Sequence, residues 1–273
     1  MLMSHEDPGA RRKYFQSGPL TLSYLDYGGD SRNILLLLHG TMNDARTYEG
    51  LTVSLEGWRI ISLDQRGHGW SDHPPDRDYS RNSYVEDVAN LIRDELGGQP
   101  VTILGHSLGG INAYQCAARC PDLVRAVIVE DIGVEITVDM SFAEQLPERA
   151  ASLQDLRDAL RRAGVRAIGY FSESVVHDEN GWGFRADLKG MIVSAQLVTG
   201  VWWNDWLSST CPILLIHGRK SFVLDLSQAA RMVARRPNTQ LVVFDNCGHS
   251  VHTDDLAGFF QVIKTFLDEQ HSR

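Results

Sequence analysis

One serine stands in a pattern that can turn its hydroxyl group into a nucleophile. Ser107 lies in a Gly-His-Ser-Leu-Gly sequence that directly follows the apolar run 101–104 and precedes the Ala-rich stretch 112–119. This order predicts a buried strand that turns sharply into a helix, with glycines where Cβ atoms would not fit. A serine at such a turn has a strained backbone and an exposed Oγ atom, so Ser107 is the candidate nucleophile.

Activation of this serine needs a base, because a serine hydroxyl is a weak nucleophile at neutral pH. His249 follows a strand-like run at 241–244 in the order Gly-His, and imidazole titrates close to neutrality. We predict that His249 is the base. His252 is the nearest competitor, and we expect it to face the last helix or solvent, whereas His39 and His106 are expected to orient loops.

The carboxylate that would orient His249 has several candidates. Asp225 follows the strand-like run 213–217, but its position also suits the cap of a helix N-terminus. Glu130 and Asp131 end the preceding strand-like run, where side chains reach the ligand side of an open α/β sheet. The residues alone leave open which of the three carboxylates is used.

Two backbone amides are candidates for binding an oxyanion beside Ser107. One is the N–H group of Leu108, the first residue of the helix that follows the serine. The other is the N–H group of Thr41, in the loop after the apolar run 34–38. Together with a serine and a histidine, these two donors would stabilise the tetrahedral intermediate of attack on a carbonyl group.

The side chains that would contact a substrate are less clearly marked. Candidates are Met42 and His106, next to the two loops, and Trp182 and Trp203 from an aromatic-rich stretch. Arg185 could anchor a substrate carboxylate, although a surface position is the plainer interpretation. No group of histidines, cysteines and aspartates has metal-ligand spacing, so we expect neither a metal nor a cofactor.

The spacing of apolar runs predicts an α/β fold. Eight strands are expected, at 12–16, 20–27, 34–38, 59–63, 101–104, 124–129, 213–217 and 240–244. Helical patterns lie between the later strands, at 83–96, 108–119, 226–234 and 254–269. Alternation with short connections is typical of a parallel sheet flanked by helices, whereas the first two strands lack a helix between them and should form an antiparallel edge.

One long stretch interrupts this alternation. Residues 134–210 are too many for an ordinary loop, and they contain helical spacing at 142–163. We interpret the stretch as a helical lid inserted after the sixth strand. The core of the fold would then consist of residues 1–133 and 211–273.

Composition narrows the classes of partner. With 273 residues, of which 43% are hydrophobic, the chain can bury one large core. A formal net charge of −9 argues against nucleic acid or an anionic membrane as a partner. No apolar stretch reaches the length of a membrane span, and residues 1–13 form a polar and charged stretch without a long apolar run. We expect all four cysteines to be reduced thiols. We expect a cytoplasmic monomer or homodimer that acts on a small molecule.

With these motifs, the chain resembles the serine hydrolases of the α/β-hydrolase fold over nearly its full length. The matching segments are 39–40, 64–69, 71–72, 105–109, 121–122 and 248–249. The resemblance implies an eight-stranded, mostly parallel sheet and a triad of serine, acid and histidine in that chain order. In most relatives the acid follows the seventh strand, at the position that Ser221 occupies here.

A narrower resemblance concerns the branch of the (acetylaminomethylene)succinate hydrolase. It rests on residues 64–69 and 121–125 and on the serine after the seventh strand. In that branch the acid follows the sixth strand, which implies Asp131, with Asp225 as the alternative. The acid would hold the His249 tautomer and stabilise the imidazolium without taking a proton itself.

The resemblance implies a cofactor-free serine hydrolase that cleaves a small carboxylic ester, thioester, lactone or amide through an acyl-enzyme. Hydrolysis of a carbon–carbon bond in a diketone-like substrate uses the same triad and is an alternative. A second alternative is a non-catalytic receptor for a small molecule, because a serine occupies the usual acid position. The fold by itself does not decide among these functions.

Overall fold

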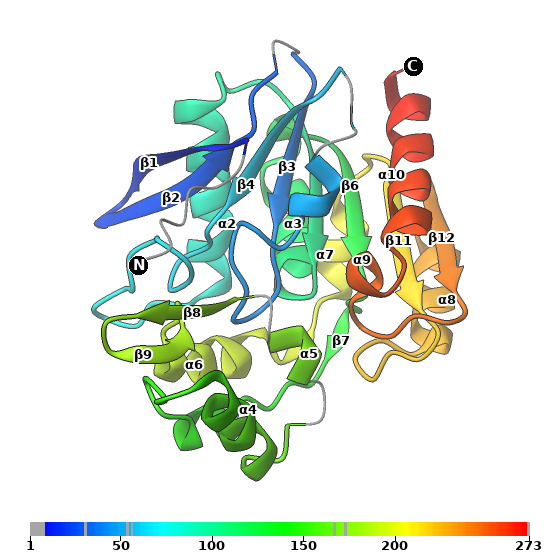
Figure 1. Ribbon diagram of the computed structural model, residues 1–273. Helices are drawn as coiled ribbons and strands as arrows, with labels where there is room; N and C mark the ends of the chain where they lie inside the picture. The colour runs from blue at the N-terminus through cyan, green and yellow to red at the C-terminus, as the bar shows by residue number, and fades with distance from the viewer. Residues whose placement is uncertain are drawn as a thin grey trace.

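A mixed eight-stranded sheet forms the centre of the computed structural model (Figure 1). The structure describes residues 9–271 except 30–31, 53–54, 56, 166–167 and 172–173. In spatial order β1-β2-β4-β3-β5-β6-β11-β12, the strands are β1 (Arg11–Ser17), β2 (Leu20–Asp26), β4 (Arg59–Leu63), β3 (Ile34–Leu38), β5 (Val101–His106), β6 (Val124–Glu130), β11 (Ile213–Gly218) and β12 (Thr239–Phe244). The predicted α/β sheet is confirmed.

The expected antiparallel edge is also present. β2 runs antiparallel to both β1 and β4, and the pairs from β4 to β12 are parallel. The parallel strands therefore end at one common edge of the sheet, and their carboxyl ends bring loops that are far apart in sequence close together.

Helices cover both faces of the sheet, as the continuous apolar strands require. They are α1 (Glu49–Thr52), α2 (Arg81–Asn90), the π-helical turn η1 (Leu91–Glu95), α3 (Leu108–Arg119), the 3-10 turn η2 (Pro121–Leu123), α8 (Leu226–Arg235), α9 (Val251–Asp254) and α10 (Leu256–His271). α10 has 16 residues, and none of the described helices is both long and apolar enough to cross a membrane.

Side chains of β3 alternate between two cores, one on each face of the sheet. Leu36 packs in a core that includes Ile111 of α3, whereas Leu37 packs in a core that includes Phe259 of α10. Because all five residues of β3 are buried, the strand reads as an uninterrupted apolar run. The carboxyl end of β3 is thereby fixed between β4 and β5.

Most of the segment between β6 and β11 lies below the carboxyl ends of the parallel strands, whereas its last helix (Trp203–Ser208) packs beside α3 (Figure 1). Its elements are β7 (Glu135–Ile136), the 3-10 turn η3 (Ser141–Gln145), α4 (Leu153–Arg162), α5 (Ile168–Phe171), β8 (Val175–Asp178), β9 (Gly181–Phe184), α6 (Leu188–Val198), β10 (Gly200–Val201) and α7 (Trp203–Ser208). Besides the expected helices, it contains two antiparallel ribbons, β7 with β10 and β8 with β9. We call residues 134–210 the lid insertion.

The turn from β5 into α3 depends on small residues. A Cβ atom at Gly105 would overlap the carbonyl oxygen of Gly109, and one at Gly109 would overlap the carbonyl oxygen of Leu38. These are backbone atoms, which cannot move aside without displacing the helix or the neighbouring strand. The glycines therefore let α3 begin directly against the sheet, which is the geometry that the sequence pattern predicts.

We expect Gly105→Ala to destabilise the fold by about 1–3 kcal/mol or more, because the added methyl group overpacks a site walled by backbone. Chemical denaturation would measure the free energy of unfolding. Gly169→Ala is the matched control, since its Cβ would meet no heavy atom within 4 Å. Equal stability of the two variants would contradict the packing argument.

Candidate active site

Ser107 lies at the tip of the turn between β5 and α3 and lines a cavity of about 750 Å³. Its backbone angles, φ 51° and ψ −115°, are strained for a residue with a side chain. The turn is fixed because the Ser107 amide donates to the carbonyl oxygen of Glu130 at 3.0 Å and its carbonyl accepts from Gly110 N at 2.9 Å. The backbone of Ser107 is thus held in place where the residue lines the cavity.

His249 lines the same cavity from the loop that follows β12. Its Nδ1 lies 2.8 Å from Oδ2 of Asp131, and the imidazole is 9% exposed. An ionised carboxylate only accepts, so Nδ1 carries the proton of this hydrogen bond. In the neutral ring, Nε2 then keeps its lone pair and can accept a proton.

Asp131 is buried and receives four hydrogen bonds. Besides His249, they come from His217 Nδ1 at 3.0 Å, from Gly218 N at 3.1 Å and from the hydroxyl of Ser221. Burial opposes ionisation, but the hydrogen bonds from His217, His249 and Ser221 outweigh it and hold the pKa of Asp131 below its ordinary value. No sequence motif marks His217, although its place at the end of β11 is a signal that could have identified it.

The structure separates the three candidate carboxylates. Asp131 contacts His249, whereas Asp225 is exposed and caps α8, accepting from Gln228 N at 2.8 Å. Asp225 therefore has the capping role that was its alternative interpretation. Glu130 is buried but contacts His252 instead of His249.

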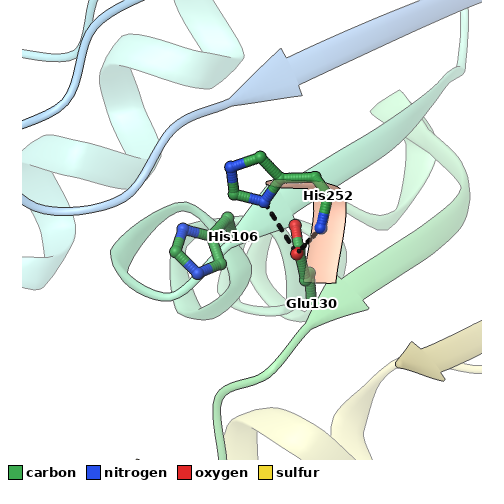
Figure 2. A group of neighbouring side chains, drawn as sticks. All are labelled: His106, Glu130 and His252. Carbon is green, nitrogen blue, oxygen red and sulfur yellow. Dashed lines mark hydrogen bonds and ion pairs between the residues drawn. The ribbon is translucent and has the colours of Figure 1, made fainter. Parts of the chain in front are cut away.

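Glu130, next to Asp131 in the sequence, belongs to a second carboxylate–imidazole pair in the interior (Figure 2). Oε1 of Glu130 accepts from both the backbone N and Nδ1 of His252, at 2.9 and 2.8 Å, and Oε2 accepts from the Tyr48 hydroxyl at 2.9 Å. His252 is 4% exposed and lies between this carboxylate and Phe259 of α10, so of its two expected positions it takes the one beside the last helix. Burial raises the pKa of Glu130, but His252 and His106 lower it by more.

His106, which directly precedes Ser107, is fully buried beside this pair. Its Nε2 donates to the carbonyl oxygen of His249 at 2.9 Å, which is the loop-orienting role expected of it. Burial lowers the pKa of His106 to about 3, so the ring is neutral. His39 is neutral for the same reason, with a pKa of about 4, and its Nε2 accepts from Gln65 N at 3.1 Å.

One group of described residues has donor atoms close enough together to raise the question of a metal. Ligand atoms of His106, Glu130 and His252 lie within 4.8 Å of one another. In Figure 2, however, His252 points its Nδ1 at Glu130, while both nitrogens of the His106 ring lie on the side away from the carboxylate. The arrangement fits a hydrogen-bonded pair better than a set of ligands converging on one ion.

The two predicted oxyanion donors flank the cavity. Thr41 and Leu108 both contribute to its lining, together with Ser107. Leu108 is the first residue of α3, where backbone N–H groups have no partner within the helix. Tyr170 of the lid insertion holds the other loop by donating its hydroxyl proton to the carbonyl oxygen of Thr41 at 2.8 Å.

The cavity is not lined by the predicted pocket residues Met42, His106, Trp182 and Trp203. Met42 and His106 are buried behind the loops, and Trp182 packs against His177 with ring centroids 4.7 Å apart. Trp203 donates its ring proton to Glu135 at the surface. Side chains that no motif marks take their place, among them Phe171, Val198 and Phe222.

Comparison with known proteins agrees with this geometry. A family model described as "Alpha/beta hydrolase family" matches residues 35–262. The 2-(acetamidomethylene)succinate hydrolase of Mesorhizobium japonicum is 28% identical over 263 residues, which cover 92% of this chain and 93% of that protein. The 2-hydroxymuconate semialdehyde hydrolase of Pseudomonas putida is 29% identical over 247 residues, 86% of each chain.

Solved structures show the same similarity in three dimensions. The crystal structure of an E-2-(acetamidomethylene)succinate hydrolase superimposes with a TM-score of 0.80 at 25% sequence identity. The match covers 95% of this chain and 99% of that one. The similarity extends over both the sheet and the segment inserted after β6.

The neutral histidines predict a loss of stability in mild acid. The folded-state pKa values of His39 and His106, about 4 and about 3, lie below the value near 6.5 expected of an unfolded histidine. The unfolded chain therefore binds more protons below pH 6.5, and the free energy of unfolding should fall by up to about 1.4 kcal/mol per pH unit for each residue.

Urea denaturation at pH 7.5, 6.0 and 5.0 would measure this slope. His39→Gln should reduce the slope of the free energy of unfolding against pH by the contribution of one proton, up to about 1.4 kcal/mol per pH unit. His73→Gln, the same substitution at an exposed histidine, is the comparison variant. Stability that is constant from pH 7.5 to 5.0 would contradict the prediction.

Proposed function

Because the chain belongs to the alpha/beta hydrolase family, we propose that it is a cofactor-free serine hydrolase acting on a small carboxylic ester, thioester, lactone or amide. The observation that carries this proposal is the hydrogen bond of 2.8 Å between His249 Nδ1 and Asp131, beside a cavity that Ser107 and His249 share. Named hydrolases among the similar proteins support a hydrolytic reaction.

In the proposed first step, Oγ of Ser107 attacks the substrate carbonyl carbon. His249 accepts the serine proton at Nε2, since its Nδ1 proton is committed to Asp131. The buried carboxylate stabilises the imidazolium that forms, and its lowered pKa keeps it ionised for this role. The intermediate collapses when His249 gives its proton to the leaving group.

The negative charge that develops on the carbonyl oxygen would be stabilised by the N–H groups of Thr41 and Leu108. Such donors lower the barrier because they already point at the position that the oxyanion will occupy. Water, deprotonated by His249, then attacks the acyl-enzyme. The bond between the acyl carbon and Ser107 Oγ breaks, His249 returns the proton to Oγ, and the carboxylic acid is released. Both halves of the reaction use the same histidine.

Carbon–carbon bond hydrolysis is the second candidate function. Its support is the similarity to the 2-hydroxymuconate semialdehyde hydrolase of Pseudomonas putida. The same serine, histidine and aspartate would serve, and the leaving group would be a carbanion stabilised by a neighbouring carbonyl. Turnover of a vinylogous 1,5-diketone without turnover of simple esters would favour this alternative.

A fluorophosphonate probe should label the protein at Ser107, as located by mass spectrometry, and Ser107→Ala should abolish both labelling and ester hydrolysis. Asp131→Asn should lower kcat by about 10⁴-fold, because an asparagine at this position stabilises the wrong histidine tautomer.

Asp225→Asn is the matched control, since it removes an exposed carboxylate that caps a helix and does not contact His249. It should retain kcat within about threefold and a free energy of unfolding close to that of the wild type, because asparagine caps a helix N-terminus about as well as aspartate. A wild-type protein that binds small molecules but is not labelled would instead indicate a receptor.

A further inference from the structure

The cavity beside Ser107 and His249 is lined mainly by apolar side chains. Those along its walls include Ile111, Ile132, Ile136, Val138, Met140, Phe142, Val165, Phe171 and Val198. Among the lining residues that the structure describes, Asp139 is the one charged side chain apart from the titratable His249, and neither lysine nor arginine occurs.

Two hydroxyl groups of the cavity lining and the guanidinium of Arg185 have partners of their own. The hydroxyl groups of Tyr170 and Ser194 are hydrogen-bonded to Thr41 O and to the Tyr84 hydroxyl, at 2.8 and 3.1 Å. The guanidinium of Arg185, the candidate anchor for a substrate carboxylate, lies 4.2 Å from the centre of the Trp70 ring and does not line the cavity. A second carboxylate on a substrate would therefore lose water without gaining a cation among the described lining residues.

We infer that this cavity accepts an uncharged, apolar acyl group and discriminates against acyl groups that carry a carboxylate. The inference rests on the proposed serine hydrolase function and adds its substrate class. Each methylene group of the acyl chain that enters the cavity removes apolar surface from water, which favours longer chains until the cavity is filled. Asp139 at the rim adds repulsion against an anion.

A matched pair of esters tests the inference on the full-length protein. 4-Nitrophenyl hexanoate and mono-4-nitrophenyl adipate have the same acyl chain length and differ in a terminal methyl group or carboxylate. We expect kcat/KM to be about 100-fold or more higher for the hexanoate. From acetate to hexanoate, kcat/KM should rise about fourfold per methylene group.

Two variants locate the effect. Val138→Lys places a cation at a half-buried lining position and should narrow the hexanoate preference about tenfold, whereas Val201→Lys, at a 70% exposed residue outside the lining, should leave it unchanged. An adipate ester cleaved as well as the hexanoate, by a protein whose Ser107 is labelled, would overturn the substrate class alone. Absence of labelling and of ester cleavage would overturn the hydrolase and this specificity together.

A second inference comes from the pair in Figure 2. His106 directly precedes Ser107, Glu130 directly precedes Asp131, and His252 lies three residues after His249. Glu130, at the end of β6, holds the helical turn that contains His252 through two hydrogen bonds. His106, at the end of β5, holds the backbone of His249 through a third. Movement of the histidine loop relative to either strand must break them.

The geometry points to Glu130 and His252 as positioning residues that hold His249 at the distance that catalysis needs. They do not line the cavity, so they would act through the loop that carries His249. Misplacement of a catalytic group by about 1 Å can cost about 10²-fold in rate. A role in positioning therefore predicts a loss in kcat with little change in KM.

We expect His252→Ala to lower kcat by about 10–100-fold with KM within about threefold. His252→Asn should restore most of the loss, because its amide nitrogen can donate from the place of Nδ1. Tyr48→Phe, which removes one bond to Glu130, should have a smaller effect in the same direction. The exposed His73→Ala serves as control.

Unfolding curves at the assay temperature would establish that each variant is folded before its kinetics are compared. Folded His252→Ala with wild-type kcat would overturn the positioning role, as would a loss that His252→Asn does not relieve. Labelling of Ser107 in the wild type tests the proposed function separately, so the failure of one proposal is distinguishable from the failure of the other.

Discussion

A buried carboxylate is the constraint on which this end of the molecule depends. Asp131 stands where β6 ends, in a backbone conformation with φ 50°, and its amide donates to Ile216 O of the neighbouring β11. Its two oxygens accept hydrogen bonds from β11, from the loop after β11 and from the loop after β12. The two histidine donors, His217 and His249, would be left buried and unsatisfied without the carboxylate, so the loops and the charge require one another.

The parallel sheet brings these partners together from distant parts of the chain. Glu130 of β6 lies opposite His106 of β5 on one side and opposite Ile216 of β11 on the other. The three strands therefore end at the same level, and the residues just past their ends meet at one edge. Ser107 and Asp131 thus share one region of space with a histidine more than a hundred positions further along the chain, and Glu130 and His252 form a second pair beside them.

Features that arise from local constraints could be predicted from the sequence. The β5–α3 turn was predictable because its glycines are required by backbone contacts, and β3 because both of its faces are buried. The cavity was not predictable in the same way, because its walls depend on how the lid insertion packs. In the sequence of that segment, an apolar residue that lines the cavity looks the same as one that faces the core. Likewise, the burial of His252 depends on the distant Glu130 and Tyr48, which local sequence does not encode.

Ser221 shows how a carboxylate beside His249 can come from a different strand. In most members of the resembling family this position carries the acid, yet here its hydroxyl donates to Asp131, which reaches the same histidine from the neighbouring strand. An imidazole responds to the place of the negative charge and not to the strand that supplies it. A carboxylate at the end of β6 instead of the end of β11 therefore still places a negative charge beside His249, provided that the position after β11 offers a hydrogen-bond donor. A serine meets this condition, since a second carboxylate there would repel Asp131 and raise its pKa.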